Sequence, residues 1–226
     1  MAPILFFVGF AAIVAAIIYF SIQAKKKRQQ GFALMARQLG FEFAITDPFN
    51  TLGEPFALLQ KGDGRGVENV SWGVWNEMET RVFDYWYYEE STDSKGNTSR
   101  TYYRFDCVLA PIEAACGHLR IDHENMFTRL ADHLAMHDLE FENEAFNKMY
   151  NIKCESPKFA NDFLDARMMQ WLLDHGAGYS FEVCADRLLL VHRKVHPEEI
   201  VPLIGTLKAF SDEIPRVVFS LYPKAG

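Results

Sequence analysis

Hydrophobic and polar positions are distributed very unevenly at the start of the chain. Residues 3–22 contain no charged side chain, and four consecutive cations stand at residues 25–28. At about 1.5 Å per residue, a helix over residues 3–22 would be about 30 Å long, which matches the hydrocarbon core of a bilayer. Cations beside such a segment stay on the cytoplasmic side. The pattern predicts a transmembrane anchor in residues 1–24, with the N-terminus outside the cell and the remaining chain in the cytoplasm.

The same helix has two further features. Ala11 with Ala15, and Ala12 with Ala16, form small-x-x-x-small pairs that could allow a weak homodimer through the membrane. Apolar residues at helical spacing continue beyond the cations, so we expect a basic juxtamembrane stalk helix over residues 25–40.

Alternating apolar and polar residues predict an aromatic-rich antiparallel β part in residues 41–115. Two aromatic runs flank a polar segment with a Gly-Asn tip, which is typical of a long hairpin, and Pro111 is expected to end its pairing. The predicted strands are residues 41–45, 56–60, 70–74, 80–90 and 100–110.

Helical and strand patterns alternate in residues 116–226, which we expect to share one core with the β part. Asp122 is a candidate helix N-cap, Ser156 and Pro157 are typical of a helix start, and Gly176 of a helix end. We expect helices at residues 122–136, 157–176 and 197–212, and strands at residues 149–154, 179–184 and 187–192, the last two forming a hairpin. The predicted class is α+β, with an N-terminal transmembrane helix.

The net charge of residues 29–226, which we call the body, restricts the partners it can bind. After residue 28 the chain has 19 basic and 30 acidic residues, a net charge of −11 with histidine neutral. Phosphate backbones repel such a surface, so nucleic-acid binding is not expected. Hydrophobic residues make up 49% of the chain, which is enough for a packed domain. Four cysteines without paired spacing are expected to be free thiols in a reducing cytoplasm.

Asp84 and Asp106 are candidate catalytic residues. Each interrupts an aromatic strand of the predicted hairpin, and in one register they lie opposite each other. Adjacent carboxyl groups raise one pKa and can serve acid–base or cation chemistry. In another register Arg104 compensates one of them, and a solvated strand face explains both.

His133 and His137 are candidate metal ligands, because four-residue spacing on a helix directs both imidazoles to one side. His123 or Asp138 could supply a third ligand. The HExxH pattern is absent, so an exposed histidine pair is the simpler interpretation. Glycines at residues 62, 64 and 66 suggest a phosphate loop, but a strand rather than a helix follows them. We expect no bound cofactor.

The motif set resembles a family of uncharacterised bacterial single-pass membrane proteins. The resemblance rests on an N-terminal span with a basic flank, an FDYWY strand at residues 83–87, and an F-E-x-x-x-F element at residues 141–146. It implies the same architecture, an N-terminal span followed by an α+β domain, and it implies no catalytic role.

These features together favour a membrane-anchored cytoplasmic module that binds or scaffolds another protein. Two alternatives stay open: a membrane-bound, metal-dependent hydrolase, and a small-ligand sensor with a pocket between sheet and helix. Whether the protein is an enzyme is left undecided by the sequence, which contains no convincing catalytic set.

Overall fold

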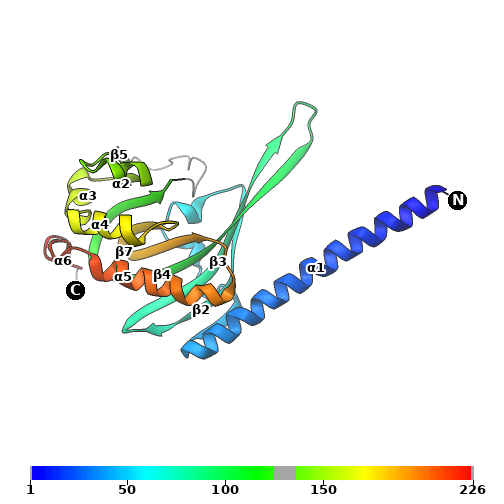
Figure 1. Ribbon diagram of the computed structural model, residues 1–226, viewed down its shortest axis with the longest axis horizontal. Helices are drawn as coiled ribbons and strands as arrows, with labels where there is room; N and C mark the ends of the chain where they lie inside the picture. Colours follow the sequence, from blue (N-terminus) through cyan, green and yellow to red (C-terminus); the bar gives the residue numbers. More distant parts are fainter. Residues whose placement is uncertain (1, 125–135, 225–226) are drawn as a thin grey trace.

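In the computed structural model, residues 2–124 and 136–224 are described. One continuous helix, α1 (Ala2–Leu39), runs through both the predicted anchor and the predicted stalk. Phe32, Met35 and Ala36 near its end are buried against the body, whereas the earlier turns project away from it (Figure 1). The helix ends before Gly40, as predicted, and Gly40 has the positive φ of 71° typical of a helix C-cap.

The apolar start of α1 was tested for the length and hydropathy of a membrane span. Across residues 2–124 and 136–224, no helix is both long enough and apolar enough to qualify as a membrane span. The predicted transmembrane helix is therefore not supported by this finding, although residues 3–22 are helical.

The described residues form one antiparallel sheet of seven strands. Its order is β1-β2-β3-β4-β6-β5, and β7 pairs with β4. β4 is central: residues 105–109 lie between β3 and β7, and residues 119–121 lie between β6 and β7. The strands are β1 (Glu42–Thr46), β2 (Gly64–Trp75), β3 (Met78–Thr92), β4 (Thr98–His123), β5 (His137–Leu139), β6 (Tyr150–Cys154) and β7 (Ser180–Arg193).

Helices and turns cover the sheet on two sides. The larger hydrophobic core joins the end of α1 to α3, α4, α5 and α6 on one face. A smaller core on the other face packs the turns η1 and η2 over aromatic residues of β3 and β4. The short elements are η1 (Thr51–Gly53), η2 (Leu58–Gln60), α2 (Glu144–Met149), α3 (Pro157–Phe163), α4 (Ala166–His175), η3 (Pro197–Glu199), α5 (Ile200–Glu213) and α6 (Arg216–Leu221).

The predicted α+β class, with an antiparallel sheet and helices, is confirmed. The long hairpin is also confirmed, and its β3–β4 arm extends beyond the sheet (Figure 1). Asn143, Ser156 and Asp165 cap α2, α3 and α4 with side-chain oxygens, so the predicted helix of residues 157–176 is two helices.

The pairing of the hairpin ends before Pro111, as predicted, because the last β3–β4 pair is Arg81 with Leu109, whereas β4 itself continues beside β7. Three other local predictions are wrong. Residues 180–193 form one strand, β7, rather than a hairpin, because Ala185 takes a left-handed conformation at a bulge opposite Cys116.

The other two errors concern single elements. Residues 56–60 contain the turn η2 instead of a strand. Leu58 and Leu59 are both buried in the smaller core, whereas successive side chains of a strand point to opposite faces of the sheet. Asp122 is a strand residue of β4 rather than a helix cap. Most of the helix predicted at residues 122–136 lies outside the described residues.

Candidate functional site

The two candidate aspartates lie directly opposite each other. The register of β3 and β4 pairs Asp84 with Asp106, and their side chains are only 5% and 0% exposed. This is the register in which the carboxyl groups face the same side of the sheet. Two buried carboxylates at adjacent positions repel each other unless a cation or a shared proton compensates them.

Arg28 of α1 supplies the cation. Its Nε and Nη2 donate to the two oxygens of Asp84 at 2.7 Å and 2.6 Å, and Nη2 also donates to Asp106. Its remaining nitrogen, Nη1, donates to the carbonyl oxygen of Val195 at 2.6 Å. The Arg28 side chain is 10% exposed, so this is a bidentate pair largely removed from water. We call Arg28, Asp84 and Asp106 the Arg28 cluster.

Two further groups complete the hydrogen bonding of this cluster. The Val195 N–H donates to Asp106 at 2.7 Å, and the Asn69 side-chain nitrogen donates to Asp84 at 2.7 Å. Asn69 sits at an irregularity of β2 with a φ of 56°, and is 1% exposed. A bulge of this kind redirects a side chain, and here it brings the amide to the carboxylate.

Burial and neighbouring charges shift the pKa values of Asp106 and Arg28. Burial raises the pKa of Asp106 to about 8, and the neighbouring Asp84 adds to this rise, while Arg28 and the Val195 amide oppose it. Burial alone would lower the pKa of Arg28, but its bonds to Asp84 and Asp106 raise the pKa above its ordinary value. At neutral pH Asp106 is therefore mostly protonated, which relieves the repulsion between the two carboxyl groups.

This geometry leaves the carboxyl pair little scope for acid–base or cation chemistry. The guanidinium occupies the space between the two side chains that a metal ion or a reacting group would need. The cluster instead joins α1 to two neighbouring strands and to the chain after β7. Arg104, the compensating residue considered from sequence, is exposed and lies over the ring of Tyr102.

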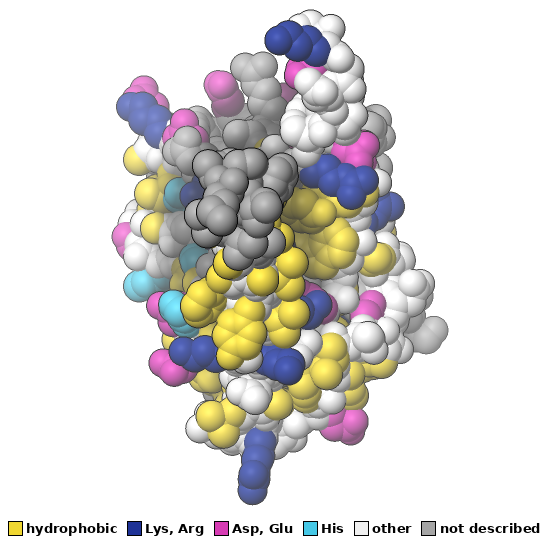
Figure 2. Space-filling model, turned by 90° about the vertical axis from the view of Figure 1, so that its right-hand side faces the viewer, with side chains coloured by type: hydrophobic (Ala, Val, Ile, Leu, Met, Phe, Trp, Pro, Cys, Tyr) yellow, Lys and Arg dark blue, Asp and Glu magenta, His cyan; other side chains and the backbone are white. Residues whose placement is uncertain are grey.

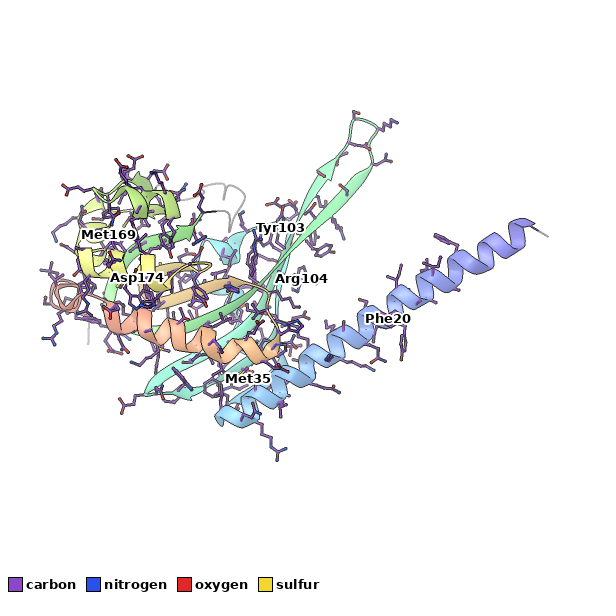
Figure 3. The ribbon with its side chains drawn as sticks, viewed as in Figure 1. Phe20, Met35, Tyr103, Arg104, Met169 and Asp174 are labelled. Atoms are coloured by element: carbon purple, nitrogen blue, oxygen red, sulfur yellow. The ribbon has the colours of Figure 1, made fainter. Side chains whose placement is uncertain are left out.

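A groove of about 1320 Å³ lies beside the cluster, where α1 leaves the body. Ala24 and Lys27 of α1, Trp86 and Arg104 of the hairpin, and Lys194 after β7 are among its lining residues. Figure 3 shows Arg104 at the base of the hairpin, Met35 where α1 meets the body, and Phe20 near the middle of α1, on the part that projects from the body.

On one face of the hairpin, two pairs of large side chains follow the Asp84–Asp106 pair toward the tip. Trp86 pairs with Arg104 across the strands, and Tyr88 pairs with Tyr102. The rings of Trp86 and Tyr88 stack with an interplanar angle of 13°. Gly66 of β2 makes room for this arrangement, since a Cβ there would lie 2.7 Å from the Trp86 ring. The glycine-rich segment therefore accommodates aromatic rings.

The histidine candidates do not come together among the described residues. His137 begins β5, is exposed and pairs with Cys154, while His133 lies outside the described residues. His123 ends β4, and Asp138 lies 3.4 Å from Lys153. Over the described ranges, no group of three or more His, Cys, Asp or Glu residues is arranged to hold a metal ion. Cys107, Cys116 and Cys154 are buried free thiols, and Cys184 is a half-buried one.

A second polar cluster was not anticipated from sequence. His118 and Glu182 lie 2.5 Å apart and are both nearly buried, and Glu182 also accepts the Ala57 N–H. On the same strand, Arg120 donates to Asp122, whose pKa burial raises to about 6 against the opposing charge of Arg120. Through Glu182, the segment before η2 is held against β4 and β7.

Comparisons with known proteins give one likeness. No protein-family model matches the sequence, and no curated protein matches it. Among solved structures, the crystal structure of mycobacterial trehalose monomycolate transport factor A has a similar fold, with a TM-score of 0.62. The likeness covers 88% of this chain and 97% of that chain at 10% sequence identity, and at this identity it shows a shared fold alone.

The first prediction concerns the cation of the cluster. Arg28→Gln leaves a buried carboxylate without its partner, so the free energy of unfolding should fall by about 3–5 kcal/mol. Lys26→Gln removes the same charge from an exposed position two residues away and should change it by less than about 0.5 kcal/mol. Urea unfolding of the full chain in mild detergent measures both, and equal effects would contradict a structural role for Arg28.

The second prediction concerns pH. Because the folded protein holds the Asp106 proton more tightly than the unfolded chain, its stabilising effect is complete below about pH 4 and is lost as pH rises through about 8. Thermal unfolding between about pH 6 and 8, above the pKa of about 6 of Asp122, should therefore show stability falling with pH, with a slope near one proton. Asp106→Asn should flatten this slope, and an unchanged slope would assign the proton to another group.

Proposed function

We propose that this protein is a membrane-anchored cytoplasmic accessory module that binds another protein. The observation that carries the proposal is the combination of an exposed apolar helix and a buried ionic link between that helix and the folded body.

Membrane attachment is supported by the exposed side chains of α1. Large apolar residues between Phe10 and Ile22 are 38–69% exposed, and at 100° per residue they lie all around the helix. A helix that is apolar on every side is stable in an apolar environment, and the body covers none of these side chains. Figure 2, viewed toward the face from which α1 projects, shows hydrophobic side chains in its middle with Lys and Arg side chains around them.

Charge supports the orientation. The cations at residues 25–28 follow the apolar residues directly, and the body beyond them is acidic. The anionic cytoplasmic leaflet attracts the cations at about 1 kcal/mol each and repels the acidic body. We therefore place the N-terminus outside and the body in the cytoplasm. The weak homodimer through the alanine pairs stays a prediction.

Partner binding is supported by the β3–β4 arm. Beyond Tyr88, β3 has no pairing with β2, so residues 89–101 form a two-stranded ribbon in solvent. Its contacts are polar ones, such as the Ser91 and Ser99 hydroxyls at 2.9 Å and the Glu90–Arg100 ion pair at 2.7 Å. A two-stranded ribbon alone is marginally stable in water, so an arm of this length favours a binding role.

The fold likeness is compatible with this role. The mycobacterial protein is named a transport factor, and an accessory module is compatible with such a name. Membership in the family of bacterial single-pass membrane proteins stays a prediction. The metal-dependent hydrolase has no supporting ligand cluster among the described residues.

The third prediction tests orientation in whole cells. A cysteine at the hairpin tip, Lys95→Cys in a Cys184→Ser background, should react with a membrane-impermeant maleimide only after the cells are broken. Ala2→Cys in the same background should react in intact cells. Labelling of Lys95→Cys in unbroken cells would place the body outside and overturn the topology.

The fourth prediction tests partner binding. A photo-crosslinking residue at Ser91 or Thr98 of the arm should give a specific protein adduct in the washed membrane fraction. The same residue at Lys148, an exposed position on α2, should give none. The proposal fails if the arm positions give no adduct above the Lys148 control, or if the chain washes out of the membrane fraction.

A further inference from the structure

We propose that the groove between α1 and the β3–β4 hairpin binds the headgroup of an anionic phospholipid that carries hydroxyl groups, drawn from the leaflet that holds α1. This inference rests on the proposed membrane attachment and adds a ligand to it. The position, charge, aromatic lining and buried polar atoms of the groove each support it.

The groove is continuous with the apolar part of α1. Ser21 and Ala24 line it, and they follow directly on the exposed apolar residues Tyr19 and Phe20. From their joining point at the body, α1 and the hairpin diverge toward the same side of the molecule (Figure 1). With the apolar residues in the bilayer, the open side of the groove faces the headgroup layer of that leaflet.

The lining carries an excess of positive charge on an otherwise acidic body. Five lining residues are Lys or Arg, and three are Glu. Glu68 pairs with Lys25 at 2.7 Å, which neutralises both charges. Glu199 accepts the backbone N–H of His196 at 2.9 Å, so its carboxylate is held in place but keeps its charge.

Three of the five lining cations are available to a phosphate. Arg28 is engaged by the cluster and Lys25 by Glu68. Among the described residues, Lys27 and Arg104 have no carboxylate within 4 Å, and Lys194 has only Asp84 at 3.9 Å. These three come from α1, β4 and the segment after β7, so they approach the groove from separate elements.

The aromatic lining suits the interfacial region of a bilayer. Trp86 and Tyr102 line the groove with ring centroids 6.2 Å apart, and Tyr102 is 49% exposed. Amphipathic Trp and Tyr rings settle where headgroups meet acyl chains. Arg104 lies over the Tyr102 ring at 5.8 Å, so cation and ring belong to one surface.

Asn69 indicates the type of headgroup. It lines the groove and is 1% exposed, and its side-chain nitrogen is used by Asp84. Its side-chain oxygen is a buried acceptor without a partner among the described residues. Because this oxygen is buried in the described conformation, a turn of the amide toward the groove would let a hydroxyl group of a polyol headgroup, such as phosphatidylglycerol, donate to it while its phosphate meets the cations.

The fifth prediction is tested on the full chain in nonionic detergent, with binding followed by calorimetric titration. The probes are dihexanoyl phosphatidylglycerol, dihexanoyl phosphatidylcholine with the same acyl chains, and inorganic phosphate. Phosphatidylglycerol should bind at least about tenfold more tightly than phosphatidylcholine, because each nearby cation favours the anionic headgroup. Inorganic phosphate should neither bind comparably nor compete.

Two matched triple variants locate the binding. Lys27→Gln, Arg104→Gln and Lys194→Gln together should weaken phosphatidylglycerol binding by about tenfold or more. Lys26→Gln, Arg100→Gln and Lys148→Gln remove the same charge outside the groove lining and should leave binding within about twofold. Thermal unfolding of both variants confirms that the fold is kept.

Several outcomes would overturn the inference. Equal binding of the two lipids would exclude headgroup recognition, competition by inorganic phosphate would indicate a site for a soluble anion, and equal losses in both variants would indicate general charge attraction. Membrane fractionation separates this inference from the proposed function. A wild-type chain that stays in membranes but shows no lipid preference refutes the groove's role alone, whereas a wild-type chain absent from membranes refutes the attachment.

Discussion

The structure depends on one buried ionic contact, the guanidinium of Arg28 between the carboxyl groups of Asp84 and Asp106. Removing a carboxylate and a guanidinium from water is costly, and each is tolerable only while the other is in place. Asp84 and Asp106 face each other because their strands pair in that register, so the sheet itself creates the need for a cation. Arg28 of the docked α1 meets that need with direct hydrogen bonds to both carboxyl groups, and α1 is therefore held at a fixed point on the sheet.

The apolar contacts of α1 reinforce this ionic contact. Phe32 and Met35 enter the larger core within two turns of Arg28, and the Arg28 guanidinium also lies 5.1 Å from the Phe32 ring. At Gly31 the helix approaches Pro197 of η3 so closely that a Cβ would lie 2.7 Å away. The helix and the hairpin both extend from this region, and the groove between them is a consequence of where they are joined. In the proposed function, the same joint holds the body in a set orientation to the membrane.

Local patterns allowed much of the sheet to be predicted. Alternation along residues 80–90 and 100–110 indicated the hairpin, and Gly40 and Ser156 marked helix boundaries correctly. The errors arose where tertiary contacts override a local signal. Ala185 and Asp186 have the appearance of a turn, yet both halves of β7 pair with β4, and one left-handed residue absorbs the irregularity.

Of the Arg28 cluster, the two aspartates were candidates from sequence, whereas Arg28 was not. The aromatic strands of the hairpin marked Asp84 and Asp106 as candidates that one register would bring opposite each other, and the structure has that register. Their cation lies 56 residues before Asp84 and 78 before Asp106, within a basic run whose evident explanation is membrane topology. Charge alone does not distinguish Arg28 from Lys26 or Lys27. The helical spacing of Arg28, Phe32 and Met35 is the one signal that could have placed Arg28 on the docked face.

The central claim, that the Arg28 cluster fixes α1 to the body, is tested most directly by a distance measurement. Spin labels at Gln23→Cys on α1 and Gln170→Cys on α4, in a Cys184→Ser background, would be measured by double electron–electron resonance in the full chain. The account predicts one narrow distance distribution for this protein and a broad one after Arg28→Gln. A broad distribution with Arg28 present, or an equally narrow one without it, would contradict the account.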